Sequence, residues 1–323
     1  IRTGRFADGP VMLQVGDRFT ITTDDILGDQ HRVSTTFKGM PGDVRSGDLL
    51  LVDDGKVTLR AVEVTDTDIV TEVIEGGAVS NNKGINLPGV AVSVPALSEK
   101  DKEDLRWALR LRADMIALSF VRSASDIEDV HAIMDEVGVR LPVIAKIEKP
   151  QAVENLSEIL DVFDGLMVAR GDLGVELPLE QVPLVQKRAV ELARNRAKPV
   201  IVATQVLESM VENSRPTRAE ASDAANAVLD GADAVMLSGE TSVGAWPIDA
   251  VRTLARIIEN TEEHGLERLG SLTGSPRTIG GAVTLAAYEV GDLINAKYLV
   301  TFTASGDSAK RLARFRSKIP MLA

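Results

Sequence analysis

Five apolar runs of this chain recur at regular intervals, and each ends in a residue that can take part in chemistry. These ends are Phe120, Glu148, Asp172, Thr204 and Ser238, so the spacings are 28, 24, 32 and 34 residues. Continuous apolar runs are typical of strands that are covered on both faces. The spacing matches one strand and one helix, which together span about 30 residues in an α/β barrel. The sequence therefore predicts parallel strands whose carboxyl ends form a ligand-binding edge.

Five strand–helix units are fewer than the eight that a closed (β/α)8 TIM barrel needs. The pattern predicts an α/β fold of this type in which only about five units are present. We expect three further strands before Ile1, and hence that the sequence is a piece of a longer protein.

Residues 4–94 differ, because their apolar residues alternate with polar ones and no helical period appears. Residues 53–56 (DDGK) lie between two apolar runs, and Asp-Gly supplies the positive φ that a tight hairpin turn requires. We expect a small all-β domain here, inserted between one barrel strand and its helix.

Helix start signals organise the rest of the chain. Capping boxes are expected at Ser98 with Asp101, at Ser125 with Glu128 and at Thr217 with Glu220. The first capping box opens a helix that runs through Arg112. The second opens a helix that ends at Gly138, and the third opens a helix that ends near Gly231. Further helices are predicted over residues 151–162, 183–196, 247–263 and 279–294, and a strand over 298–302. The expected division is a strand end at residues 1–3, the β domain at 4–94, the barrel at 95–266, and a linker with the start of a C-terminal α/β domain at 267–323.

Composition excludes several function classes. The net charge of −12 argues against nucleic-acid and anionic-membrane partners, which require basic patches. The chain has no cysteine, which excludes disulfides and thiol catalysis. Together with the lack of an apolar run near 20 residues, this predicts a soluble cytoplasmic protein. The three histidines (His31, His131 and His264) are interpreted as surface or structural residues.

Lys146 and Glu148 lie two residues apart in one predicted strand, so their side chains point the same way. A buried lysine and carboxylate form a costly pair unless a divalent cation or an anionic ligand shares the charge. The alternative is a structural ion pair that closes the barrel.

The other strand ends complete a candidate site. Asp172 could join Glu148 as an oxygen ligand for Mg²⁺ or Mn²⁺, and Gly171 lets backbone amides approach an anion. The Thr204 hydroxyl could bind a substrate carboxylate or relay a proton. An equal alternative is that Thr204 is a structural strand residue whose hydroxyl is already hydrogen-bonded within the protein. The segment that starts at Ser238 leads into a helix whose amides could face a phosphate.

Several segments of the chain resemble signature blocks of the pyruvate kinase family. These segments are residues 144–148 (IAKIE), 166–178 (LMVARGDLGVELP), 202–205 (VATQ), 214–220 (SRPTRAE) and 230–241 (DGADAVMLSGET), with 52–55 (VDDG) and 82–89 (NKGINLPG) in the β domain. The resemblance runs along the whole chain and has a bacterial character.

This resemblance implies phosphoryl transfer from phosphoenolpyruvate to ADP, giving pyruvate and ATP. It implies Mg²⁺ or Mn²⁺ bound by Glu148 and Asp172, with K⁺ bound by residues outside this chain. Lys146 would be the catalytic lysine, and Thr204 and Ser238 would lie on the route of the proton. The remaining implied roles are substrate binding by Lys146, Arg170, Gly171, Asp172 and Thr204; nucleotide binding by Arg2, Asp54 and Lys83; support of the site by Ser119, Phe120 and Glu240; and effector binding by Thr303, Ser305, Gly306 and Ser308.

The family also implies a homotetramer, a sugar-phosphate or nucleotide effector, and a role for the β domain as a lid. Two other functions are considered. One is a Mg²⁺-dependent aldolase or lyase that holds a pyruvate enolate on a related barrel, which would not need the inserted lid. The other is a non-catalytic sugar-phosphate-binding protein, which predicts loss of the chemical residues, yet Lys146, Glu148, Asp172 and Thr204 are all present.

Overall fold

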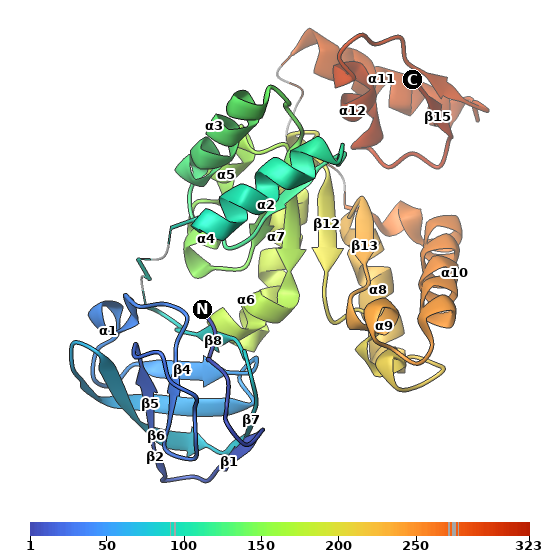
Figure 1. Ribbon diagram of the computed structural model, residues 1–323. Coiled ribbons are helices and arrows are strands. Elements are labelled where there is room, and N and C mark those ends of the chain that lie inside the picture. Colours follow the sequence, from blue (N-terminus) through green and yellow to red (C-terminus); the bar gives the residue numbers. More distant parts are fainter. Residues whose placement is uncertain (91, 94, 271, 273–275, 277) are drawn as a thin grey trace. The chain divides into compact units, whose positions relative to one another are not determined.

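The structure, a computed structural model, describes residues 1–90, 92–93, 95–270, 272, 276 and 278–323. These residues form two compact units (Figure 1). The first unit combines Ile1–Glu99 with Gly171–Gln181, and the second combines Lys100–Arg170 with Val182–Ala323. A bond from Asn86 Nδ2 to Glu176 Oε1 (3.0 Å) is one contact that joins the two segments of the first unit.

The first unit is built on a six-stranded sheet with the order β3-β2-β6-β5-β4-β8, and β1 pairs separately with β7. All neighbours are antiparallel except β2 and β3, which are parallel. The strands are β1 (Val11–Leu13), β2 (Arg18–Thr22), β3 (Arg32–Ser34), β4 (Leu49–Val52), β5 (Val57–Val64), β6 (Asp68–Glu75), β7 (Gly77–Val79) and β8 (Ile85–Asn86).

The predicted hairpin at residues 53–56 is confirmed, because Val52 pairs with Val57 across it. Asp53, Asp54 and Gly55 all have positive φ angles (54°, 58° and 84°), as a primed hairpin turn requires of its central residues. The alternating pattern is confirmed in β6, where every second residue is buried. The prediction of a domain without helices is wrong in one place, since the Met40–Asp43 segment forms the short helix α1. Proline at its first turn starts that helix, and a four-residue helix is too short to show a period.

The second unit contains a parallel five-stranded sheet with the order β13-β12-β11-β10-β9. Each strand therefore pairs with its neighbours in the chain, as in a (β/α) barrel, and this confirms the fold class. The strands are β9 (Ile116–Leu118), β10 (Val143–Ile147), β11 (Gly165–Ala169), β12 (Val200–Ala203) and β13 (Ala234–Met236). Burial of all five residues of β11 explains its unbroken apolar run.

Helices alternate with these strands (Figure 1). They are α2 (Glu99–Arg110), α3 (Ile127–Val137), α4 (Pro150–Glu154), α5 (Leu156–Val162), α6 (Arg170–Glu176), α7 (Val182–Asn195), α8 (Arg218–Asp230), α9 (Gly239–Ser242) and α10 (Pro247–Gly265), with 3₁₀ turns η1 (Ala124–Asp126), η2 (Leu179–Gln181), η3 (Glu208–Val211) and η4 (Leu266–Arg268).

Three helix predictions need correction. The first helix ends at Arg110 rather than Arg112. The second capping box is formed by Ser123 and Asp126, not by Ser125 and Glu128, because a 3₁₀ turn precedes the α-helix. The helix expected over residues 151–162 is split at Asn155 into α4 and α5.

The third capping box is confirmed. The Thr217 hydroxyl accepts from the Glu220 amide, and the helix ends at Gly231, whose φ is 100°. The Glu220 carboxylate also accepts from the amides of Ser209 (2.7 Å) and Thr217 (2.7 Å). Burial works to raise the pKa of Glu220, but the hydrogen bonds from Ser209 and Thr217 outweigh it and lower the pKa below its ordinary value of 4.5.

Replacing Glu220 with glutamine is therefore expected to lower the free energy of unfolding by about 1 kcal/mol at neutral pH. A lowered pKa in the folded state stabilises the fold above pH 4.5 and is lost as the pH falls through the folded-state value. The difference between the two proteins, measured by urea unfolding at a series of pH values, should shrink in acid. Glu212→Gln, at an exposed position nearby, is the control. A difference that stays constant with pH would contradict this assignment.

The C-terminal segment contains α11 (Ile279–Leu293), β14 (Leu299–Val300), α12 (Asp307–Ala313) and β15 (Met321–Leu322). The predicted strand over residues 298–302 is shorter than expected, because only Leu299 and Val300 pair with β15. Much of the expected linker (271, 273–275 and 277) lies outside the described residues. No helix among the described residues has the length and apolar character needed to span a membrane.

Candidate active site

The carboxyl ends of the five parallel strands carry the predicted chemical residues of the second unit. Ser119 and Phe120 follow β9, Lys146 lies in β10 with Glu148 just after it, and Arg170 follows β11. Thr204 follows β12, and Ser238 lies two residues after β13. Because the strands are parallel and adjacent, these residues share one edge of the sheet.

Lys146 and Glu148 form an ion pair at the end of β10. The distance from Lys146 Nζ to Glu148 Oε1 is 2.6 Å, and the side chain of Glu148 is 0% exposed. Lys146 Nζ also donates to Ser119 Oγ (2.9 Å). The prediction that the lysine and the carboxylate face the same way is confirmed. Through the bond to Ser119, Lys146 also connects β10 with the segment that follows β9.

The second carboxylate oxygen of Glu148 accepts a hydrogen bond from the Phe120 amide, at 2.6 Å. Phe120 has a φ of 55°, which is uncommon for a residue other than glycine. The strand end therefore turns its amide toward the buried carboxylate. Lys149 Nζ lies 5.7 Å from the centre of the Phe120 ring, in the range of a cation–π contact.

Arg170 is bonded to the loop that follows β12. Its Nη2 donates to the carbonyl oxygens of Thr204 (2.9 Å) and Gln205 (3.1 Å), and its Nη1 lies 2.6 Å from Asp223 Oδ2. Thr204 and Gln205 both have left-handed backbones, with φ angles of 67° and 51°. Each such residue stores strain that its surroundings must offset. These contacts tie the Arg170 side chain to the backbone of the Thr204–Gln205 loop.

Glu240 is buried beneath the same loop, with 0% exposure. Its Oε1 accepts from the Leu207 amide (3.0 Å) and its Oε2 from the Ser238 amide (2.8 Å). One carboxylate thus joins the segments that follow β12 and β13. Burial, together with the charges of Glu240 and Glu220, raises the pKa of the neighbouring Glu208.

The first unit holds the residues that were predicted on the nucleotide side. Arg2 Nη1 donates to the Asn82 carbonyl (2.9 Å), and Lys83 Nζ lies 2.8 Å from Asp53 Oδ1. The ion-pair partner of Lys83 is thus Asp53, the neighbour of the predicted nucleotide residue Asp54. Burial works to raise the pKa of Asp53, but hydrogen bonds from Lys83 and Lys56 outweigh it and lower that pKa.

Gly171 and Asp172 lie in the first turn of α6 and belong to the first compact unit. Lys146 and Glu148 belong to the second unit, so the expected grouping of Asp172 with Glu148 stays a prediction. Glu148 is chemically suited to bind a divalent metal ion, because carboxylate oxygens are the ligands that Mg²⁺ and Mn²⁺ prefer. Within the described residues, no three His, Cys, Asp or Glu side chains are grouped for metal binding. Bound substrate and water oxygens would have to supply the remaining ligands.

The predicted effector loop precedes α12. The Gly306 amide donates to Thr303 Oγ1 (3.0 Å), and Gly306 has a φ of 80°. Ser308 lies in the first turn of α12, while Ser305 lies in the bend. The loop is therefore a compact turn with hydroxyl side chains.

Comparisons with known proteins agree with one family. A family model described as pyruvate kinase, barrel domain, matches residues 1–251. A pyruvate kinase of Corynebacterium efficiens is 62% identical over 322 residues, covering 100% of this chain and 68% of its own length. A pyruvate kinase of Mycobacterium tuberculosis is 59% identical over 323 residues, with 100% and 68% covered. The crystal structure of a pyruvate kinase from Cryptosporidium parvum has a TM-score of 0.89 at 37% identity, covering 99% of this chain and 68% of that one.

Proposed function

We propose that this chain, which belongs to the pyruvate kinase family, transfers the phosphoryl group of phosphoenolpyruvate to ADP around the Lys146–Glu148 pair. The observation that carries the proposal is this pair, because a lysine is held 2.6 Å from a buried carboxylate at the strand ends of a barrel. The reaction yields pyruvate and ATP.

In the proposed reaction, the bond between phosphorus and the enol oxygen breaks as a terminal oxygen of ADP bonds to phosphorus. Negative charge then develops on the enolate oxygen and on the moving phosphoryl group. The Lys146 ammonium, oriented by Ser119 and Glu148, stabilises that charge. A proton finally reaches the methylene carbon of the enolate, and Thr204 and Ser238 lie on its proposed route.

Glu148 and Asp172 are the residues that would hold a divalent cation. When bound, Mg²⁺ or Mn²⁺ neutralises phosphoryl and enolate oxygens as a Lewis acid. The amide of Phe120 and the ammonium of Lys146 fix both oxygens of Glu148 in place for this role. We also propose that K⁺ is bound as a second cation.

Further roles are proposed from the family resemblance. Gly171 and Thr204 would bind the substrate carboxylate, with Arg170 orienting Thr204. Arg2, Lys83 and Asp54 would serve the nucleotide, with Asp53 holding Lys83. Residues 303–308 would bind an effector. On the same basis we propose the four-part domain division and a role for the β domain as a lid. We also propose a homotetramer and a cytoplasmic location.

The proposal is tested by measuring ADP-dependent pyruvate release from phosphoenolpyruvate in the gene product that contains this chain. We expect activity with Mg²⁺ or Mn²⁺, and loss of activity with a chelator that is reversed when the metal is restored. An aldolase or lyase would instead convert its substrates without any nucleotide. A non-catalytic protein would bind ligands and release no pyruvate, so either result would contradict the proposal.

A further inference from the structure

The guanidinium group of Arg170 is fully occupied by contacts within the second unit. An arginine side chain has five N–H donors in a fixed plane. Nε and Nη2 of Arg170 donate to the carbonyl oxygen of Thr204 (3.3 and 2.9 Å), and Nη2 also donates to that of Gln205 (3.1 Å). Nη1 donates to Asp223 Oδ2 (2.6 Å) and to Gln186 Oε1 (3.4 Å). All the donors are therefore engaged, and none remains for a substrate.

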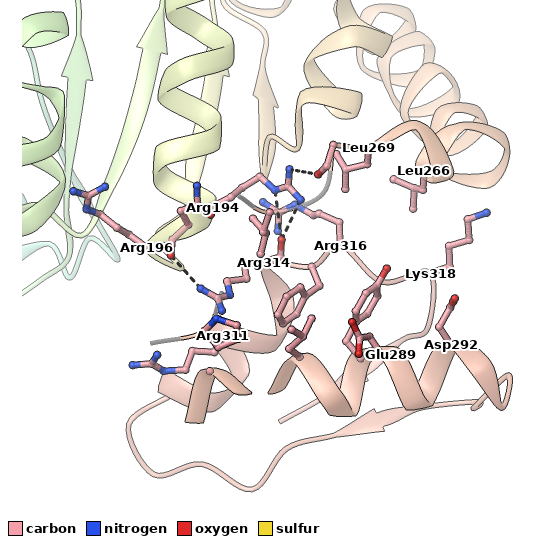
Figure 2. A pocket seen from close by; sticks show the side chains of 18 of the residues that line it. Arg194, Arg196, Leu266, Leu269, Glu289, Asp292, Arg311, Arg314, Arg316 and Lys318 are labelled. Carbon is pink, nitrogen blue, oxygen red and sulfur yellow. Dashed lines mark hydrogen bonds between the residues drawn. The ribbon is translucent and has the colours of Figure 1, made fainter. Parts of the chain in front are cut away.

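Arg314, in the C-terminal segment, shows the contrast (Figure 2). Its Nη1 donates to the Asn195 carbonyl oxygen (3.1 Å), but its Nε is buried and has no hydrogen-bond partner among the described residues. Arg170 and Arg314 are both half-buried. Partial burial alone thus does not give an arginine a partner for each donor, and the acceptors around Arg170 form a set that the fold assembles.

The Gln186 amide is held from both of its ends. Gln186 lies in α7 and is 5% exposed. Its Oε1 accepts from Arg170, and its Nε2 donates to Asp230 Oδ2 (2.9 Å). Asp230 Oδ1 pairs with the Lys187 ammonium. A buried amide between a cation and a carboxylate can satisfy both neighbours in one orientation only, so α7 presents an oxygen to Arg170.

Two aspartates of α8 complete this network. Asp223 and Asp230 are separated by about two turns of the helix, so both lie on the same side of it. Asp223 pairs with Arg170, and Asp230 holds Gln186. The network thus joins the end of β11 to α7, to α8 and to the loop that follows β12.

The loop that Arg170 holds has an unfavourable backbone. Thr204 and Gln205 both have positive φ angles (67° and 51°), and a β-branched residue such as threonine rarely adopts one. The guanidinium group donates to the two successive carbonyl oxygens, which stabilises this conformation. The place of the Thr204 hydroxyl depends on that backbone, since the hydroxyl itself donates to the Ala203 carbonyl oxygen (2.7 Å).

We propose that Asp223 and Gln186 are positioning residues that act through Arg170. They hold the guanidinium group, which in turn holds the Thr204–Gln205 backbone and so keeps the Thr204 hydroxyl in place for proton transfer. Arg170 then touches no substrate, which departs from the substrate-binding role that the family resemblance implies for it. The inference rests on the proposed function, because Thr204 gives the network its effect on the reaction.

The first test is a double-mutant cycle on the turnover number for pyruvate release by the gene product. Asp223→Asn and Gln186→Leu should each lower the turnover number by about tenfold. Combined with Thr204→Ala, each should change it by less than about twofold, because no hydroxyl is left to position. Gln186→Glu keeps an oxygen toward Arg170 and should retain more turnover than Gln186→Leu, which guards against misfolding of the leucine variant.

Asp161→Asn is the matched control, since Asp161 also pairs with an arginine (Arg196, 3.0 Å) but does not belong to the network. It should leave the turnover number unchanged. A further loss of about tenfold when Asp223→Asn or Gln186→Leu is combined with Thr204→Ala would show action independent of Thr204 and would overturn the proposal. Normal turnover in both single variants would overturn it as well.

The second test needs no activity. Backbone hydrogen exchange of peptides that cover residues 204–207, followed by mass spectrometry, should be about tenfold faster in Asp223→Asn and Gln186→Leu. Exchange in Asp161→Asn should match that of the unmodified protein. If the gene product released no pyruvate, the proposed function would fail, yet the exchange rates would still decide whether the network holds the loop. Unchanged exchange in both network variants would contradict this inference alone.

Discussion

Replacing Lys146 with methionine in the gene product is expected to reduce the turnover number by about a thousandfold. Methionine keeps much of the length of the side chain but removes the ammonium that lies 2.6 Å from Glu148 and 2.9 Å from Ser119 Oγ. The developing charge on the enolate oxygen then loses the cation that the proposed function assigns to it. Steady-state pyruvate release measures the effect, and Mn²⁺ titration followed by paramagnetic relaxation measures metal binding, which should persist.

Lys149→Met is the matched control for this experiment. Lys149 is three residues further along the chain, and its ammonium lies 5.7 Å from the centre of the Phe120 ring. We expect a much smaller loss of turnover in this variant. Near-normal turnover in Lys146→Met would remove the lysine from its assigned role. Loss of metal binding in the same variant would mean that the pair acts through the cation site alone.

Replacing Glu240 with alanine is expected to lower the free energy of unfolding by about 3 kcal/mol, since the buried amide of Leu207 and the partly buried amide of Ser238 both lose their acceptor. The segments after β12 and β13 would then separate, which should also lower the turnover number by about tenfold through misplacement of Thr204 and Ser238. Urea unfolding and steady-state kinetics measure the two effects.

Glu259→Ala provides the comparison, because Glu259 lies exposed on α10 and the change is chemically the same. It should leave the free energy of unfolding within about 0.5 kcal/mol of the unmodified protein. The free energy of unfolding of Glu240→Gln should fall between those of the two alanine variants. The glutamine side-chain oxygen can accept from one backbone amide, but its NH₂ group faces the other. Equal stability of the Glu240→Ala and Glu259→Ala variants would show that the buried carboxylate does not join the two segments.

Much of the fold could be predicted from the sequence because its signals are local. The strands β10, β11 and β12 are almost entirely buried, so their apolar runs are continuous, and some helix ends are marked by residues such as Thr217 and Gly231. The Lys146–Glu148 pair was predictable for the same reason, since both side chains lie on one face of one strand.

The contacts that orient the site could not be predicted, because they join distant segments. Phe120 and Thr204 adopt left-handed backbones without the glycine that usually signals them. Only the folded loops reveal that the Phe120 amide reaches Glu148 and that Arg170 reaches Thr204. Likewise, two adjacent aspartates in a turn are indistinguishable in sequence, and the structure shows that Asp53 is the partner of Lys83.

Gly231 ends α8 directly against the side chain of Arg194. A Cβ atom at this position would lie 2.5 Å from Arg194 Cδ, in addition to straining a backbone with a φ of 100°. Any larger residue would displace Arg194 as well as weaken the helix end. A random-mutagenesis screen for loss of folding stability should therefore recover substitutions at residue 231.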